Sequence, residues 1–244
     1  MKKLFLSIII CMITAIVGAQ NIQLHYDFGS MIYDSQSTRP KVTTTVEMFK
    51  PDSWGSTFFF VDMDYTNKGV TGAYWEIARE LKFWNGPFSA HVEYNGGLNS
   101  SSVFNNSYLL GATYSWNSSD FSKGFTFTPT YKIIQKNVKP HNFQLTITWY
   151  VNFCKDKLTF SGFADFWKEK HGVITGFGND GNAVFENRNF IFITEPQFWV
   201  NLNKFYGVSD KFNLSVGSEW EISSNFGIMN GWKWMPTLAM KWSF

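Results

Sequence analysis

Apolar and polar side chains alternate along much of the chain, most regularly in residues 143–153 and 212–222. In the first segment Phe, Leu, Ile, Trp, Val and Phe occupy every second position, and Gln, Thr, Thr, Tyr and Asn lie between them. A period of two is typical of a β-strand whose two faces meet different surroundings. Both segments are therefore predicted to be strands.

The same pattern predicts twelve strands, at residues 22–28, 40–50, 55–65, 72–84, 87–96, 106–116, 123–135, 141–154, 157–168, 189–203, 210–223 and 234–244. A strand that crosses a bilayer needs about 9–11 tilted residues, and most of these segments are long enough. An even strand number is expected of a single-chain bacterial barrel. The predicted fold class is all-β, a transmembrane antiparallel up-and-down β-barrel of about 12 strands.

The C-terminal segment alternates to its last residue, with apolar side chains at Trp234, Pro236, Leu238, Met240, Trp242 and Phe244. A final strand that stops on an aromatic residue is typical of Gram-negative outer-membrane barrels. Phe244 is therefore expected to act as part of the signal that the barrel-assembly machinery recognises.

The N-terminus has the three parts of a secretory signal peptide: two lysines after Met1, an apolar stretch from Leu4 to Val17, and small residues ending at Ala19. Residues 1–19 are predicted to be removed, leaving residues 20–244 as the barrel. The apolar stretch is too short for a spanning helix. Cys11 lies inside it and follows Ile10, so a lipoprotein signal is disfavoured.

Connection lengths predict the two rims of the barrel. Joins near 51–54, 85–86, 117–122 and 155–156 are short, and the alternate joins at 29–39, 66–71, 97–105, 136–140, 169–188 and 224–233 are mostly longer. Short turns on one rim and long loops on the other are typical of outer-membrane barrels. This order places both termini on the periplasmic side, where the short turns lie. The join at 204–209 should be one of these turns but is only moderately short.

Residues 74–84 fit two patterns. Trp75, Ala78 and Leu81 have helical spacing, whereas a strand would place Arg79 among outward apolar residues. An arginine facing lipid at mid-depth costs about 2–4 kcal/mol, and less near an interface. A strand is favoured because both neighbouring segments are strands.

Composition narrows the class of protein. The chain has 26 Phe, 11 Trp and 10 Tyr, which a barrel can place against lipid and in aromatic girdles. Removing two signal lysines takes Lys+Arg from 21 to 19, equal to the 19 Asp+Glu, and this balance argues against a nucleic-acid binder. Cys154 would be the one remaining cysteine, so no internal disulfide is expected. The histidines lack metal-ligand spacing, and no cofactor is expected.

The order of segments resembles the nucleoside-specific Tsx channel family, and more closely an uncharacterised Bacteroidetes branch of that superfamily. The resemblance lies in residues 42–49 leading through Trp54 into 58–65, then in 74–79, 86–88 and 160–167. It implies a monomeric 12-stranded barrel with a narrow lumen lined by aromatic and ionisable groups.

Alternation also predicts which side chains face the lumen. If the odd-numbered residues Phe59 to Tyr65 face lipid, the even-numbered ones face inward. The predicted substrate-binding residues are Phe58, Phe60, Asp62, Asp64, Tyr74, Glu76, His91, Glu93, Asp165, Trp167, Glu195 and Trp199. Together they offer stacking surfaces and hydrogen-bond acceptors to a small polar solute such as a nucleoside. For any single residue, a structural role in the interior is the stronger interpretation.

Three functions stay open. The favoured one is passive, substrate-selective uptake of nucleosides or similar small polar solutes across the outer membrane, without catalysis. The second is a barrel that acts through its external loops, as an adhesin, receptor or structural element. The third is a barrel enzyme using lumenal or rim acids and His91 with a serine such as Ser89. Ser89 and His91 lie about 7 Å apart on one strand face, and a general base must be within hydrogen-bonding reach of its nucleophile. A secreted β-protein that is not a barrel is the remaining possibility.

Overall fold

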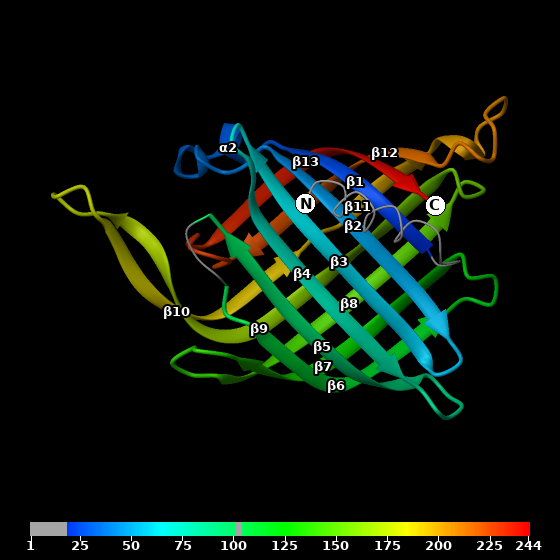
Figure 1. The fold of residues 1–244 in the computed structure, drawn as a ribbon, viewed down its shortest axis with the longest axis horizontal. Helices are drawn as coiled ribbons and strands as arrows, with labels where there is room; N and C mark the ends of the chain where they lie inside the picture. The colour runs from blue at the N-terminus through cyan, green and yellow to red at the C-terminus, as the bar shows by residue number, and fades with distance from the viewer. Residues whose placement is uncertain (1–18, 101–103) are drawn as a thin grey trace, which may run out of the picture.

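The computed structural model describes residues 19–100 and 104–244, so the expected signal peptide lies almost wholly outside the described residues. The strands are β1 (Ala19–Asp27), β2 (Val42–Asp52), β3 (Gly55–Thr66), β4 (Gly69–Leu81), β5 (Phe88–Asn99), β6 (Ser107–Asn117), β7 (Lys123–Ile134), β8 (His141–Phe153), β9 (Leu158–Phe177), β10 (Ala183–Thr194), β11 (Gln197–Asn201), β12 (Leu214–Ser224) and β13 (Trp232–Ser243). They form one antiparallel sheet that closes into a barrel, because β13 pairs with both β12 and β1 (Figure 1).

The barrel has twelve strands because β10 and β11 are two parts of one strand. Both lie between β9 and β12. The register continues across the break, since Ile193 pairs with Asp165 and Gln197 pairs with Ser161. The break falls at Pro196, which has no backbone N–H to donate to a ladder. The predicted all-β barrel of about 12 strands is thus confirmed.

Residues 72–84, which also fit a helical pattern, lie mainly in strand β4. Arg79 is on the outer face, as the alternation predicts, but it is close to a turn. Its guanidinium donates to Asp52 Oδ2 at 2.6 Å and Oδ1 at 2.9 Å, and to Thr57 at 3.0 Å. The charge is therefore neutralised at the rim of the barrel, where an arginine costs little.

The barrel has two rims, and both ends of the described chain lie at the same one. One, the terminal rim, carries Ala19, Phe244 and the connections 53–54, 82–87, 118–122, 154–157 and 202–213, which include the 3₁₀ turn η2 (Leu202–Lys204). The other, the loop rim, carries the segment 28–41, with the short helix α2 (Gly29–Ile32) and the 3₁₀ turn η1 (Asp34–Gln36), and the connections 67–68, 135–140, 178–182 and 225–231. Within the described residues, no helix is long and apolar enough to cross a membrane.

The connections that differ most from the sequence-based prediction are 66–71, 169–188 and 204–209, and the last of these is the longer connection 202–213. The expected loop 66–71 is a two-residue turn at 67–68, made possible by Gly69 with φ +93°. The expected loop 169–188 is mostly a paired extension of β9 and β10, which turns at 178–182 and projects beyond the barrel (Figure 1). Two register irregularities interrupt this pairing. Such bulges disrupt the two-residue period, which is why the alternation did not reveal the strands.

The outer face of the barrel is apolar and rich in aromatic side chains. On β1, Ile22, Leu24 and Tyr26 are 44%, 41% and 39% exposed, while the residues between them are buried. Ring pairs cross neighbouring strands, such as Phe166 with Phe190, stacked at 5.7 Å between centroids. An apolar surface this extensive is typical of a barrel that lies in lipid.

Candidate functional site in the barrel interior

The interior face follows from the register. Gln23, His25 and Asp27 on β1 are buried and point inward, and residues opposite them on neighbouring strands share that face. Carried around the barrel, this places the predicted residues on the interior side, at Phe58, Phe60, Asp62, Asp64, Tyr74, Glu76, His91, Glu93, Asp165, Trp167 and Trp199. Glu195 lies at the break between β10 and β11, where its carboxylate interacts electrostatically with those of Glu219 and Asp62. Whether they bind a solute stays a prediction.

A tryptophan fills the interior near the terminal rim. Trp199 is fully buried, and its indole N–H donates to Gln197 Oε1 at 2.9 Å. The Lys241 ammonium lies 4.2 Å from the centroid of its ring, and the His25 ring meets it edge-on at 6.3 Å. These contacts hold the indole across the interior, so it narrows any path through the barrel.

A second aromatic group lies nearer the loop rim. Trp167 packs with the buried side chains of Ile191 and Ile193, and Phe226 meets its ring edge-on at 6.1 Å. Its indole N–H donates to Glu169 Oε2 at 2.9 Å. Trp167 is therefore buried among apolar neighbours, with one face beneath the Lys132 ammonium at 4.6 Å.

Ser89 and His91 belong to one hydrogen-bond network around Glu80. The Ser89 hydroxyl donates to Glu80 Oε2, and Thr113 donates to Oε1 at 2.7 Å. The His91 ring places Nδ1 2.6 Å from Glu80 Oε1 and Nε2 3.1 Å from Glu93 Oε2. Because the serine hydroxyl is directed to a carboxylate and not to the imidazole, the pair lacks the contact that nucleophilic catalysis requires.

Arg39 is an interior residue that the sequence analysis missed. It belongs to the segment 28–41, yet its guanidinium donates to Asp27 Oδ2 at 2.9 Å and to Glu221 Oε2 at 2.7 Å. Both carboxylates are nearly buried. In the same segment Gly29 lies close to the barrel wall, since a Cβ there would lie 2.8 Å from Asp27 Oδ1 and 2.8 Å from the Met235 sulfur on β13. An arginine in a predicted loop gave no sequence signal of this contact.

Carboxylates outnumber cations in the interior. The inward acidic residues are Asp27, Glu47, Asp62, Asp64, Glu76, Glu80, Glu93, Asp165, Glu169, Glu195, Glu219 and Glu221. Arg39, Lys132 and Lys241 are the main cations that face them. In the part of the chain that the structure describes, no three His, Cys, Asp or Glu residues are placed to hold a metal ion. The interior is therefore acidic, which suits hydrogen-bond donors or organic cations.

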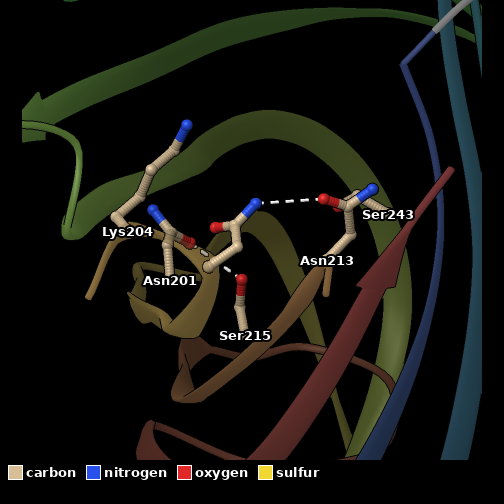
Figure 2. Close-up of a pocket in the computed structure, with 6 residues that line it drawn as sticks. Asn201, Lys204, Asn213, Ser215 and Ser243 are labelled. Atoms are coloured by element: carbon tan, nitrogen blue, oxygen red, sulfur yellow. Dashed lines mark hydrogen bonds between the residues drawn. The ribbon is translucent and has the colours of Figure 1, made fainter. Parts of the chain in front are cut away.

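A small pocket lies at each rim. At the terminal rim, a pocket of about 170 Å³ is lined by Asn201, Asn203, Lys204, Asn213, Ser215 and Ser243. Figure 2 shows its polar lining, in which Ser215 donates to Asn201 at 2.8 Å and Asn203 donates to Asn213 at 3.0 Å. At the loop rim, a pocket of about 250 Å³ lies beside Asp64 and Tyr74. Between them, side chains such as Trp199, Gln23 and Met235 are fully buried, so the interior is narrow.

Solved structures show the class of protein to which this barrel is similar. The chain resembles a KdgM porin with a TM-score of 0.50 and 11% sequence identity, over 93% of this chain and 99% of that chain. A KdgM porin in complex with disordered oligogalacturonate gives the same values. A NanC porin gives a TM-score of 0.53 and 9% identity, over 93% and 100% of the two chains. At these identities the likeness shows the fold, that of a porin barrel.

The sequence itself belongs to the family described as Domain of unknown function (DUF5020), whose model matches residues 19–244. No curated protein matches the sequence. The resemblance to the nucleoside-specific Tsx family stays a prediction, and the established class is the porin-like 12-stranded barrel.

Proposed function

We propose that this protein is an outer-membrane channel that admits small polar solutes passively, with nucleosides as one candidate class. The observation that carries the proposal is a closed barrel with an apolar outer face, a polar, acidic interior and a small pocket at each rim. The porin fold supports it. Outer-membrane location, periplasmic termini, a monomeric state and insertion through Phe244 are parts of the same proposal.

The interior suits a selective, low-conductance channel better than a wide pore. Aromatic rings line one wall, where Phe60 lies 6.0 Å from Phe58 and 5.9 Å from Tyr74 between centroids. Carboxylates of Asp62 and Glu76 lie on the same strands. Stacking faces beside acceptors match the chemistry of a flat polar ring with hydroxyl and amine donors.

Single-channel recording in planar bilayers tests the proposal. The refolded protein, verified by heat-dependent gel mobility, should show small conductance that nucleosides reduce more than free bases or sugars do. Phe60→Ala should abolish this reduction, whereas Phe59→Ala, one residue along and facing outward, should not. If no solute alters the conductance, the protein is a general pore and not a selective channel. A folded barrel that does not conduct would refute the channel.

A second candidate rests on the projecting hairpin of β9 and β10. It carries Phe177, Val184 and Phe185 at 71%, 45% and 58% exposure, beyond the barrel wall. Exposed apolar side chains on such an extension favour contact with another surface. Shortening the hairpin across residues 174–186 should leave conductance intact and abolish adhesion to surfaces or cells if the hairpin carries the function.

A further inference from the structure

Three buried acceptor oxygens in the barrel interior have no hydrogen-bond donor among the described residues. They are Glu93 Oε1, Asn95 Oδ1 and Asp165 Oδ1. Asn95 is only 4% exposed, and the Glu93 side chain is 10% exposed. Buried polar atoms in folded proteins are almost always paired, because an unpaired one loses its hydration without gaining a hydrogen bond. Three unpaired acceptors in one region therefore indicate that a donor belongs there.

These oxygens come from facing parts of the interior. Asn95 lies directly opposite Glu76 in the pairing of β4 with β5, and Glu93 lies one inward position away. Asp165, on β9, reaches the same region from another part of the wall, because it interacts electrostatically with both Glu76 and Glu93. We call Glu76, Glu93, Asn95 and Asp165 the central acceptor group.

The protein balances the charge of this group only in part, because the three carboxylates of Glu76, Glu93 and Asp165 are near one lysine, Lys132, and one histidine, His91. Lys132 is the cation that interacts with Glu76, Glu93 and Asp165. Its ammonium donates instead to Gln144 Oε1 at 2.6 Å, and no ion pair within 4.0 Å joins it to a carboxylate in the described part of the chain. On the other side, His91 contacts Glu93 only through Oε2. One carboxylate oxygen of Glu93 and one of Asp165 thus stay available to a ligand.

Aromatic side chains adjoin the central acceptor group. The Tyr74 hydroxyl donates to Glu76 Oε1 at 2.6 Å, and the Tyr74 ring lies beside that of Phe60. Rings next to carboxylates form the usual environment for an organic cation, since the ring face attracts positive charge. A compact metal ion is disfavoured, because the described acidic residues do not form a metal-ligating set.

We propose that the central acceptor group is a binding site for a small organic cation that carries primary ammonium groups. This inference rests on the proposed channel function and narrows its solute class. An ammonium group has three N–H donors, which matches the three unpaired oxygens in number. It also adds positive charge beside three carboxylates, which otherwise share Lys132 and the His91 ring.

Binding of putrescine, a linear diamine, to the folded barrel in detergent tests the site by isothermal titration calorimetry. The neutral 1,4-butanediol, of the same length, is the matched ligand control. Putrescine should bind and the diol should not. Glu93→Gln and Asp165→Asn should each weaken putrescine binding at least about tenfold, because each removes a charged acceptor. Glu186→Gln, on the exposed hairpin, should leave binding unchanged.

The outcomes separate this inference from the channel itself. If the wild-type barrel conducts but putrescine neither binds nor reduces the current, the cation site is refuted and the channel stands. If putrescine binds equally in the wild type and in both folded variants, the central acceptor group is not the site. If putrescine binds as expected but the folded barrel does not conduct, the channel is refuted and the binding site is retained.

Discussion

Arg39 should hold the segment 28–41 against the inner wall of the barrel. It joins that segment to Asp27 on β1 and to Glu221 on β12, while Pro40 lines the pocket at the loop rim. The segment therefore borders the mouth of the barrel at the loop rim. Replacing Arg39 with Met keeps much of the apolar stem and removes the guanidinium.

The structure sets the size of the expected effect. Removing one partner of a buried ion pair costs about 3–5 kcal/mol, because the other charge is left buried and unpaired. The lower end applies here, since the Arg39 side chain is 26% exposed and the two carboxylates are 8% and 9% exposed. Asp27 and Glu221 also keep donors from Gly29 and Ser223. A loss of about 3 kcal/mol shifts the docking equilibrium of the segment roughly 100-fold.

Amide hydrogen exchange measures this shift directly. The Tyr33 amide donates to Gly29 and the Gln36 amide donates to Tyr33, within the docked segment. In Arg39→Met both amides should exchange about 100-fold faster, and the single-channel conductance should rise as the opening widens. Lys41→Met, two residues along at an exposed position, is the matched control and should change neither.

A triple variant separates electrostatics from packing. Arg39→Met combined with Asp27→Asn and Glu221→Gln removes all three charges, so no buried charge is left unpaired. The Tyr33 and Gln36 amides should therefore regain most of the protection from exchange that Arg39→Met alone loses. Equal exchange rates in Arg39→Met and Lys41→Met would refute the reasoning, because the ion pairs would then not hold the segment.

Two further predictions concern the terminal rim of the barrel. Trp199→Ala should lower the free energy of unfolding by about 3–5 kcal/mol and raise the conductance. Trp220→Ala, on the outer face, is the control and should not raise the conductance. The thermal midpoint in a gel-shift assay measures the stability, and bilayer recording measures the conductance. In the turn 118–122, hydrogen bonds from the Ser118 hydroxyl and from the Ser122 amide and hydroxyl lower the pKa of Asp120 to about 2. A lowered pKa stabilises the fold above the ordinary value of 3.8 and loses that effect as the pH falls toward 2. Asp120→Ala should therefore lower the thermal midpoint at pH 7 and have no such effect at pH 2; an equal loss at both would contradict the pKa.

The phase of each strand could be predicted from the sequence, because the pleat fixes which residues share a face. Phe58, Phe60, Asp62 and Asp64 were placed inward on that ground alone, and the register of β3 agrees. Alternation also favoured a strand at residues 72–84, despite the outward Arg79. Its neutralisation by Asp52 could not be predicted, since that contact joins positions 27 residues apart.

Other features depend on information that a two-residue period does not contain. The continued pairing of β9 with β10 is interrupted by two register irregularities, so a paired extension looked like a long loop. Arg39 lies in the irregular segment 28–41, and the sequence pattern does not show where such a segment runs. The broken strand needs Gly162, because a Cβ there would lie 2.5 Å from the Glu195 carbonyl oxygen. Only the assembled barrel brings those two residues together.

Hydrogen bonding separates the acidic residues that stabilise the barrel from those that can bind a solute. Glu80 accepts bonds from Ser89 and Thr113 and contacts His91, so it is an internal structural group. Glu93 and Asp165 each keep one buried oxygen without a donor. A carboxylate retained in this state reduces stability unless something pairs with it. The interior acids therefore differ in how far they are paired: Glu80 is saturated by the barrel, whereas Glu93 and Asp165 are each paired through one oxygen and keep the other for a solute that supplies its own N–H groups.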